Sequence, residues 1–238
     1  MVQAEFQLEQ AIASDVEKCM QYILEQYDFK LQVKTNWPLN DQTYGEVGGR
    51  FIDSFFRTRL PEIVKQKASR EGHLYHIVAA KKPSSRRAIE DVLLAWYNPQ
   101  FDPEPHAIRL SLKGHYKGRA SQPNLASLRK ALAFYTDRNN LDEHIVVAYC
   151  PFTPIEIPES GFTMEFSKER PIQAFHLKNL SEKNMWLGDI GSGGQIMLSE
   201  IENICSTYRT RVEFVELMTA KATEWRNRLK NLRAKRGR

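Results

Sequence analysis

The sequence has 238 residues, of which 42% are hydrophobic and 26% are charged, so the chain can bury one sizeable core. It has no run of 18 apolar residues, which argues against a transmembrane helix, and MVQAEFQLEQ lacks the basic and apolar regions of a secretion signal. We therefore expect a cytoplasmic protein whose three widely spaced cysteines are reduced thiols.

The net charge of +5 is concentrated at the C-terminal end. Residues 221–238, KATEWRNRLKNLRAKRGR, hold eight of the 34 Lys and Arg residues and one of the 29 acidic residues, so the rest of the chain is slightly acidic. A run of this kind is typical either of a solvated helix end or of a segment that contacts phosphate groups.

Apolar residues at helical spacing predict two helices in the first third of the chain, over 3–27 and about 45–67. The stretch 31–43 between them contains Pro38, Asn40 and Asp41 and is expected to be a loop.

Three strands are predicted next, over 73–80, 91–97 and 107–114, followed by a helix over 124–135 and a fourth strand over 144–152. The second strand, DVLLAWY, is a continuous apolar run, which suggests burial on both faces. This order of elements predicts an α/β fold with a mixed central β-sheet flanked by helices.

The last third contains two candidate short strands, over 162–168 and 172–177, and a Gly-rich loop over 187–195. A helix is predicted from about 195 to 234, since positions from 197 to 232 at spacings of four and three are nearly all apolar. Such a helix packs on its own domain or pairs in a dimer. We divide the chain into an α/β domain over 1–195 and a long basic C-terminal helix over 196–238.

The stretch RLSLKGHYKG, residues 109–118, alternates polar and apolar residues as a strand with one apolar face does. Asp91 begins the preceding predicted strand. If the two strands pair, Asp91 meets Ser111 and Lys113 at one end of the sheet. A carboxylate there can hold Mg²⁺, and a nearby lysine can position or deprotonate water and stabilise negative charge on a phosphate.

These residues resemble the motif of the PD-(D/E)XK nuclease superfamily, and within it the type II restriction endonucleases. The family places an Asp at the start of one strand and Asp/Glu–X–Lys on the next; here Asp91 stands in EDVLL, and Ser111 and Lys113 stand in LSLKG. The resemblance covers roughly residues 44–152. Two departures are that Ser111 replaces the acidic residue and that no Pro precedes Asp91.

The resemblance implies a restriction-endonuclease-like core and a Mg²⁺-dependent, sequence-specific endonuclease that acts on double-stranded DNA as a homodimer. It implies catalytic roles for Asp91, Lys113, Ser111 and Glu46, with Asp91, Glu46 and Ser111 holding the metal. Glu46 comes from the helix before the first strand, for which Glu62 is the second match, and Glu90 is another candidate for the missing carboxylate.

Two basic stretches are candidate DNA contacts, the turn KKPSSRR and the segment KGHYKGR, in which basic residues surround an aromatic one. The residues expected to contact DNA are Lys81, Lys82, Arg86, Arg87, His115, Lys117 and Arg119.

Two other functions remain open from the sequence. One is a non-catalytic nucleic-acid-binding protein that uses the basic C-terminal helix, and the other is a protein-interaction module that pairs through that helix. The histidines at 73, 76, 106, 144 and 176 show no spacing typical of a metal-binding motif, and LGDIGSGG lacks the Lys-Ser/Thr of a phosphate-binding loop.

Overall fold

The computed structural model describes residues 2–26, 30–34, 38–40, 43–68, 74–83, 89–116, 124–157, 161–166, 172–188, 194–199 and 204–236. The chain divides into two units. Unit 1 consists of Met1–Pro123 and Asp142–His176, and unit 2 consists of Asn124–Leu141 and Leu177–Arg238. The units therefore do not coincide with the division after residue 195 that the sequence suggests.

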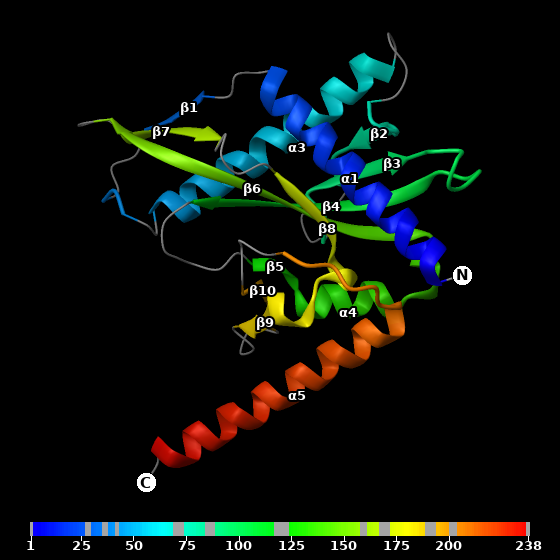
Figure 1. The fold of residues 1–238 in the computed structure, drawn as a ribbon. Coiled ribbons are helices and arrows are strands. Elements are labelled where there is room, and N and C mark those ends of the chain that lie inside the picture. Colours follow the sequence, from blue (N-terminus) through cyan, green and yellow to red (C-terminus); the bar gives the residue numbers. More distant parts are fainter. Residues whose placement is uncertain are drawn as a thin grey trace. The chain divides into compact units, whose positions relative to one another are not determined.

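Unit 1 is built on a mixed sheet, which confirms the predicted α/β fold with a central sheet flanked by helices (Figure 1). The strand order is β1-β7-β6-β4-β3-β2, and β8 also pairs with β6. The pair β4·β6 is parallel and the other pairs are antiparallel. The strands are β1 (Lys30–Val33), β2 (Ile77–Lys81), β3 (Val92–Trp96), β4 (His106–Tyr116), β6 (Glu143–Ile157), β7 (Gly161–Phe166) and β8 (Gln173–His176).

Strand β1 lies in the stretch 31–43, so the prediction of a loop there is wrong for its first residues. The strand has only four residues, KLQV, and it is recognisable as a strand only through its antiparallel pairing with β7. A segment this short carries too little alternation to be identified from sequence alone.

Strand β4 is central, because it pairs with β3 on one side and β6 on the other. Its apolar residues Leu110 and Leu112 are buried in the main hydrophobic core, as the alternating pattern predicts. The polar face is not simply solvated, since Ser111 is only 2% exposed.

Among the described residues, three helical segments precede β2 in unit 1: α1 (Val2–Gln26), the π-helix η1 (Tyr44–Gly48) and α3 (Gly49–Ala68). They agree closely with the two predicted helices. Residues of α1 and α3 share one hydrophobic core with the sheet, and Figure 1 shows both helices over the same face. The core includes Ile12, Val16 and Met20 of α1, Ile52, Phe56 and Leu60 of α3, and Val92, Leu94 and Ile108 of the sheet.

Helix α3 begins directly against β4 at a contact between two glycines. A Cβ atom placed on Gly114 would lie 2.8 Å from Cδ1 of Ile52, closer than real Cβ atoms approach a neighbour, and 3.0 Å from Cα of Gly49, which is tighter than most Cβ contacts. The absence of a side chain at Gly114 thus sets how near the first turn of α3 can come to the strand.

Unit 2 contains a three-stranded antiparallel sheet in the order β5-β10-β9. Its other elements within the described ranges are two α-helices and three short 3₁₀ helices. The bounds are β5 (Asn124–Ser127), α4 (Leu128–Thr136), η2 (Arg138–Asn140), η3 (Leu177–Asn179), η4 (Glu182–Asn184), β9 (Met185–Gly188), β10 (Gln195–Leu198) and α5 (Arg211–Arg236). The helix predicted over 124–135 therefore begins at Leu128, four residues later than predicted, because residues 124–127 form β5 and pair with β10.

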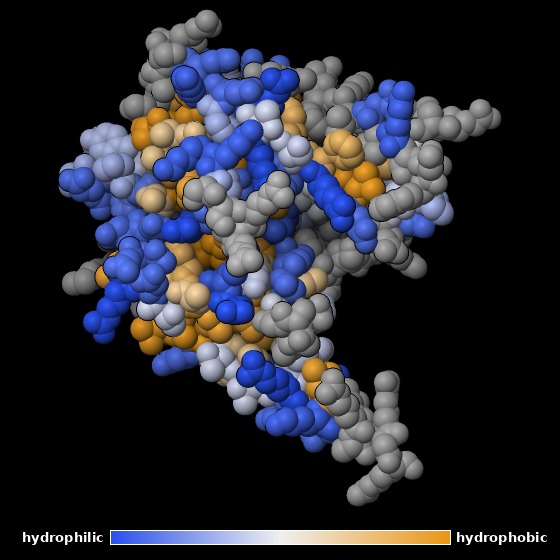
Figure 2. Space-filling model, turned by 180° about the vertical axis from the view of Figure 1, so that it is seen from behind, coloured by the Kyte–Doolittle hydropathy of each residue, from blue (hydrophilic) through white to orange (hydrophobic). Residues whose placement is uncertain are grey.

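The predicted long C-terminal helix is present as α5, but it begins at Arg211 and not near residue 195. Phe214, Met218 and Ala222 are buried at four-residue spacing, and the Phe214 ring lies 4.7 Å from that of Tyr135 on α4. The first half of α5 thus packs within its own unit, which was one of the two alternatives. Figure 2 shows hydrophilic and hydrophobic side chains side by side along the coloured part of the protruding helix.

Over the ranges given above, no helix has both the length and the apolar character that crossing a membrane requires.

Candidate active site

The start of β3 is held against β4 by the backbone and by the Asp91 side chain. Val92 pairs with Leu110, and the backbone N–H of Asp91 donates to the carbonyl oxygen of Leu110 at 2.8 Å. The backbone N–H of Leu112 donates to Oδ2 of Asp91 at 2.7 Å. The predicted strand pair is therefore present, and the Asp91 carboxylate is fixed beside the Ser111–Lys113 segment.

A second carboxylate, which the sequence does not single out, reaches this point from α3. Asp53 lies four residues before Arg57 on the helix, and Nε of Arg57 is 3.0 Å from Oδ1 of Asp53. The Nη2 group of Arg57 donates to Oδ1 of Asp91. One guanidinium thus bridges carboxylates that come from α3 and from the start of β3.

The pKa of Asp53 reflects its burial and the charges around it. Burial, and after it the negative charge of Asp91, raise the pKa of Asp53 from 3.8 to about 6, although the positive charges of Arg57 and Lys113 act to lower it. Lys113 is therefore near enough to Asp53 for the two charges to interact. Two carboxylates held this close favour any cation that can neutralise both.

Arg57 fills that role in the structure described here. Burial acts to lower the pKa of Arg57, but its hydrogen bond to Asp91 and the charges of Asp53 and Asp91 outweigh burial and raise it. The guanidinium therefore stays charged, and its position between the two carboxylates shows where a positive charge is stabilised.

The two carboxylates suit Mg²⁺, which takes oxygen ligands and is usually held in proteins by one or two carboxylates together with water or substrate phosphate. The residues present therefore fit the predicted metal. Asp91 and Asp53 are the two side chains that could hold it. The predicted ligand set was Asp91, Glu46 and Ser111. The structure adds the carboxylate of Asp53 as a further candidate ligand.

Ser111 stands where the resembled family has an acidic residue. It lies in β4 paired with Val147 of β6 and is almost fully buried. An ionised carboxylate at a position this buried is costly unless it is paired or bound to a metal. A neutral hydroxyl avoids that cost, and the carboxylate that the structure brings beside Asp91 is Asp53 of α3.

Glu90, the other candidate for the missing carboxylate, is engaged elsewhere. It is 5% exposed, and its Oε2 lies 3.2 Å from Nη1 of Arg109. Nε of Arg109 donates to Glu143 on β6. Arg109, the first polar residue of the RLSLKG pattern, thus neutralises two carboxylates and ties β4 to both neighbouring segments.

Glu46 lies on η1, directly before α3, and is exposed. Its predicted role as a metal ligand stays a prediction. Asp53 lies seven residues further along the chain, and its charge interacts with those of Asp91 and Lys113.

The predicted DNA contacts are only partly within the described residues. Lys81 and Lys82 are exposed at the end of β2, and Lys81 pairs with Leu93, so both lie at the end of the sheet where Asp91 directly precedes β3. His115 lies on β4, but its side chain is outside the description, as are residues 86, 87, 117 and 119 altogether.

A weak signal for Asp53 does exist in the sequence. It lies directly beside Ile52 and three residues before Phe56, both of which face the core, so an acidic residue borders the apolar face of a predicted helix. Arg57 follows at i+4, which is the spacing of a helical ion pair. Neither observation says which strand the pair would meet.

A scan against protein-family models finds no match for the chain, and no curated protein is significantly similar to it.

Proposed function

We propose that the chain is a Mg²⁺-dependent, sequence-specific endonuclease that hydrolyses phosphodiester bonds in double-stranded DNA, as type II restriction enzymes do. The observation that carries this proposal is the meeting of Asp91 with the Ser111–Lys113 segment on neighbouring strands, with Asp53 and its charge beside them. The strand order, three antiparallel strands followed by a parallel fourth, is also the one expected for the resembled PD-(D/E)XK core.

Asp91 and Asp53 are the proposed metal ligands, with Glu46 and Ser111 as the further ligands implied by the resemblance. Mg²⁺ bound there would supply a Lewis acid for the phosphate oxygens and would lower the pKa of a bound water.

Lys113 has the catalytic role that does not depend on metal coordination. Its ammonium group is proposed to orient the attacking water and to stabilise the negative charge that develops on the phosphate. Its proximity to Asp53 supports this role, because a lysine beside a carboxylate is held in place while its remaining donors can reach other groups.

Arg57 is proposed to exchange partners when substrate binds. Its guanidinium neutralises Asp53 and Asp91 in the structure described, and it is 42% exposed. A phosphate oxygen pair accepts two parallel hydrogen bonds from a guanidinium as a carboxylate does. Arg57 can therefore turn to the DNA backbone once the two carboxylates have another cation.

The proposed partner is duplex DNA, and the proposed assembly is a homodimer. Two copies related by a twofold axis would present one site to each strand of a palindromic sequence. Lys81 and Lys82, exposed at the end of β2, are in the right part of the sheet to contact the DNA backbone beside the site.

The test is cleavage of unmethylated phage DNA by the purified protein, in Mg²⁺ and in EDTA, together with two lysine variants. Lys113→Ala should lower the cleavage rate by about a hundredfold or more, the size of effect expected for loss of a positioned catalytic group. Lys65→Ala, which removes an exposed lysine from α3, should leave the rate unchanged.

Discrete fragments from the parent protein in Mg²⁺, absent in EDTA, are the expected result. A smear would keep the nuclease and remove sequence specificity. Failure of the parent protein to cut DNA, with binding to duplex intact and equal in Lys113→Ala, would overturn the catalytic proposal and favour a non-catalytic nucleic-acid-binding protein.

A further inference from the structure

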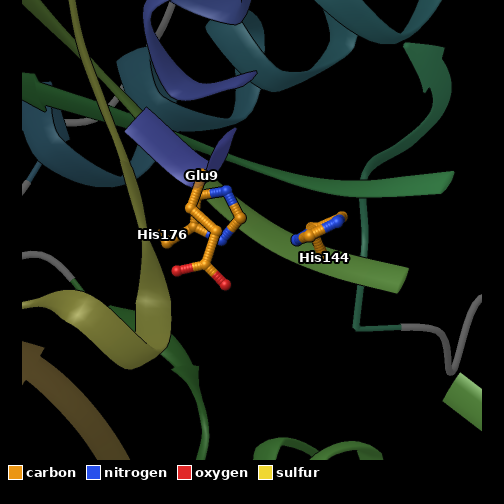
Figure 3. A group of neighbouring side chains, drawn as sticks. All are labelled: Glu9, His144 and His176. Atoms are coloured by element: carbon orange, nitrogen blue, oxygen red, sulfur yellow. The ribbon is translucent and has the colours of Figure 1, made fainter. Parts of the chain in front are cut away.

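A second cluster of chemically active side chains lies elsewhere in unit 1. Glu9 of α1, His144 of β6 and His176 of β8 each offer one ligand atom, and these atoms all lie within 4.8 Å of one another. Figure 3 shows a ring nitrogen of His144 directed toward the Glu9 and His176 side chains. In the part of the chain that the structure describes, this is the only group of three such residues able to hold a metal ion.

Sheet register explains how residues so far apart in sequence meet. His176 pairs with Val146 across β6·β8, and His144 lies two residues before Val146, so both histidines stand on the same face of the sheet. Val146 belongs to the core shared with α1, so this is the face from which Glu9 approaches. Helix α1 thus lies over a pair of imidazoles.

The cluster is distinct from the candidate active site. His144 pairs with Ile108 of β4, five residues before Lys113, which corresponds to about 16 Å along an extended strand. The chemistry differs as well, because two imidazoles and one carboxylate suit a borderline metal such as Zn²⁺, whereas Mg²⁺ prefers oxygen ligands.

Two of the three side chains in the cluster are almost fully buried. Glu9 is 2% exposed and His176 is 3% exposed, while His144 is half-buried. An ionised carboxylate that is removed from water needs a cation or strong hydrogen bonds to offset its desolvation. The half-buried His144 leaves a route by which an ion can enter.

A further histidine supports His144 from the outside. Nε2 of His144 lies 3.1 Å from Nδ1 of His106, and Nε2 of His106 lies 3.4 Å from Oδ2 of Asp102. In the described part of the chain no hydrogen bond reaches Nε2 of His106, but the negative charge of Asp102 at this distance favours a proton there. Nδ1 of His106 then accepts, and Nε2 of His144 donates. Nδ1 of His144 then keeps its lone pair, as a metal ligand requires.

We propose that Glu9, His144 and His176 form a binding site for a divalent transition metal, Zn²⁺ in the first place. Ligand atoms around a tetrahedral Zn²⁺ are about 3.3 Å apart, given metal–ligand distances near 2.0–2.1 Å, so side-chain movements of about 1–2 Å bring this set together. Three protein ligands leave a fourth position for water. Because the ligands come from α1, β6 and β8, the ion fastens α1 to the sheet and stabilises unit 1.

The experiment uses the full chain, stripped of metal with a chelator and kept in excess Mg²⁺ so that the carboxylate pair at Asp53 and Asp91 is saturated. Zn²⁺ binding is measured by calorimetry, and Co²⁺ is added as a spectroscopic probe of nitrogen ligands. We expect one ion per chain and a higher melting temperature with Zn²⁺. His144→Asn and Glu9→Gln should each weaken binding by about a hundredfold or more, and Asp102→Asn by about tenfold through its effect on His106.

His76→Asn is the matched control. It removes a half-exposed imidazole that bonds Asp15, and asparagine tolerates the left-handed backbone of this position, where φ is 60°. Binding should be unchanged in this variant. If the parent protein binds less than about one-tenth of an equivalent of Zn²⁺, or if every variant binds as the parent does, the proposed site is wrong; the parent measurement decides the first point even where a variant does not fold.

Discussion

Asp53 should set the pH response of metal binding at the candidate active site. Its pKa is raised to about 6, first by burial and then by the charge of Asp91. Since a proton competes with the metal for this carboxylate, Mg²⁺ affinity should fall about tenfold per pH unit below 6 and level off above it. Calorimetric titration of Mg²⁺ between pH 5 and pH 8 measures this directly, and a flat profile would remove Asp53 from the ligand set.

Asp53→Asn tests the effect of Asp53 on the stability of the fold, separately from its proposed role in metal binding. The folded protein keeps the Asp53 proton up to about pH 6 and the unfolded chain only to about 3.8, so ionisation costs stability as the pH rises through this window. The variant should gain about 1–2 kcal/mol over the parent above pH 6, after allowance for solvent screening, and nothing below pH 3.5. Chemical denaturation at pH 3.5 and 8 tests this, with the exposed Asp142→Asn as control.

The three cysteines differ in reactivity for a physical reason. Burial raises the pKa of Cys19 to about 12 and raises that of the fully buried Cys150 as well, whereas Cys205 is only half-buried. The thiolate is the reactive form, so a thiol reagent should modify Cys205 in minutes and the other two only after unfolding. Rapid modification of two or three thiols in the native protein would contradict the burial.

Residues on consecutive predicted elements can be placed together from the sequence, whereas residues brought together only by the topology of the fold cannot. Asp91 and Lys113 were expected together because each lies on one of two consecutive predicted strands. Asp53 joins them only through the way α3 lies on β4. Glu9 and His176 are 167 positions apart in the numbering, and no local spacing could reveal that α1 lies over β8.

The contact between α3 and β4 should be weakened by the addition of a single methyl group. In Gly114→Ala the new Cβ would meet Ile52 and Gly49 at 2.8 and 3.0 Å, so α3 must shift away from β4. We expect a loss of about 1–3 kcal/mol in unfolding free energy and a drop in Mg²⁺ affinity, because Asp53 moves with the helix.

Gly49→Ala is the matched comparison for that prediction. Its Cβ would lie 3.8 Å from the carbonyl oxygen of Gly114, an ordinary contact, in a helical backbone. Alanine in a helix is favoured over glycine by up to about 1 kcal/mol, so this variant should be neutral or more stable. Equal destabilisation by the two substitutions, measured in denaturant, would mean that the glycine contact does not set the helix position.

Short strands are where sequence-based prediction of the elements fails. β1, β5 and β10 have four residues each, and each is defined by its pairing with a distant strand. Residues 195–198, QIML, fit the apolar spacing of the following helix as well as they fit a strand, so only pairing with β9 and β5 decides between them. The longer α1, α3 and β4 bury one face over many residues and were predicted with nearly correct ends.

The positive charge on α5 should govern how strongly the affinity for DNA depends on salt concentration. Arg226, Arg228 and Lys230 are exposed on this helix. If each contacts a phosphate, replacing all three by Gln should reduce the slope of log affinity against log salt by about 2.7. The same replacement at Lys18, Arg59 and Lys65, exposed on α1 and α3, should leave the slope unchanged. Fluorescence anisotropy at several salt concentrations compares the two triple variants.

The path of the chain between the units governs how the protein can be divided. Unit 2 takes residues 124–141 from between β4 and β6 and the remaining residues from the C-terminal end. A truncation after His176 would therefore keep α4 while deleting α5, exposing the rings of Phe134 and Tyr135 that now lie under Arg211 and Phe214. No single cut separates the units. Expression of unit 1 alone would require excising 124–141 and rejoining two parallel strands with a new crossover.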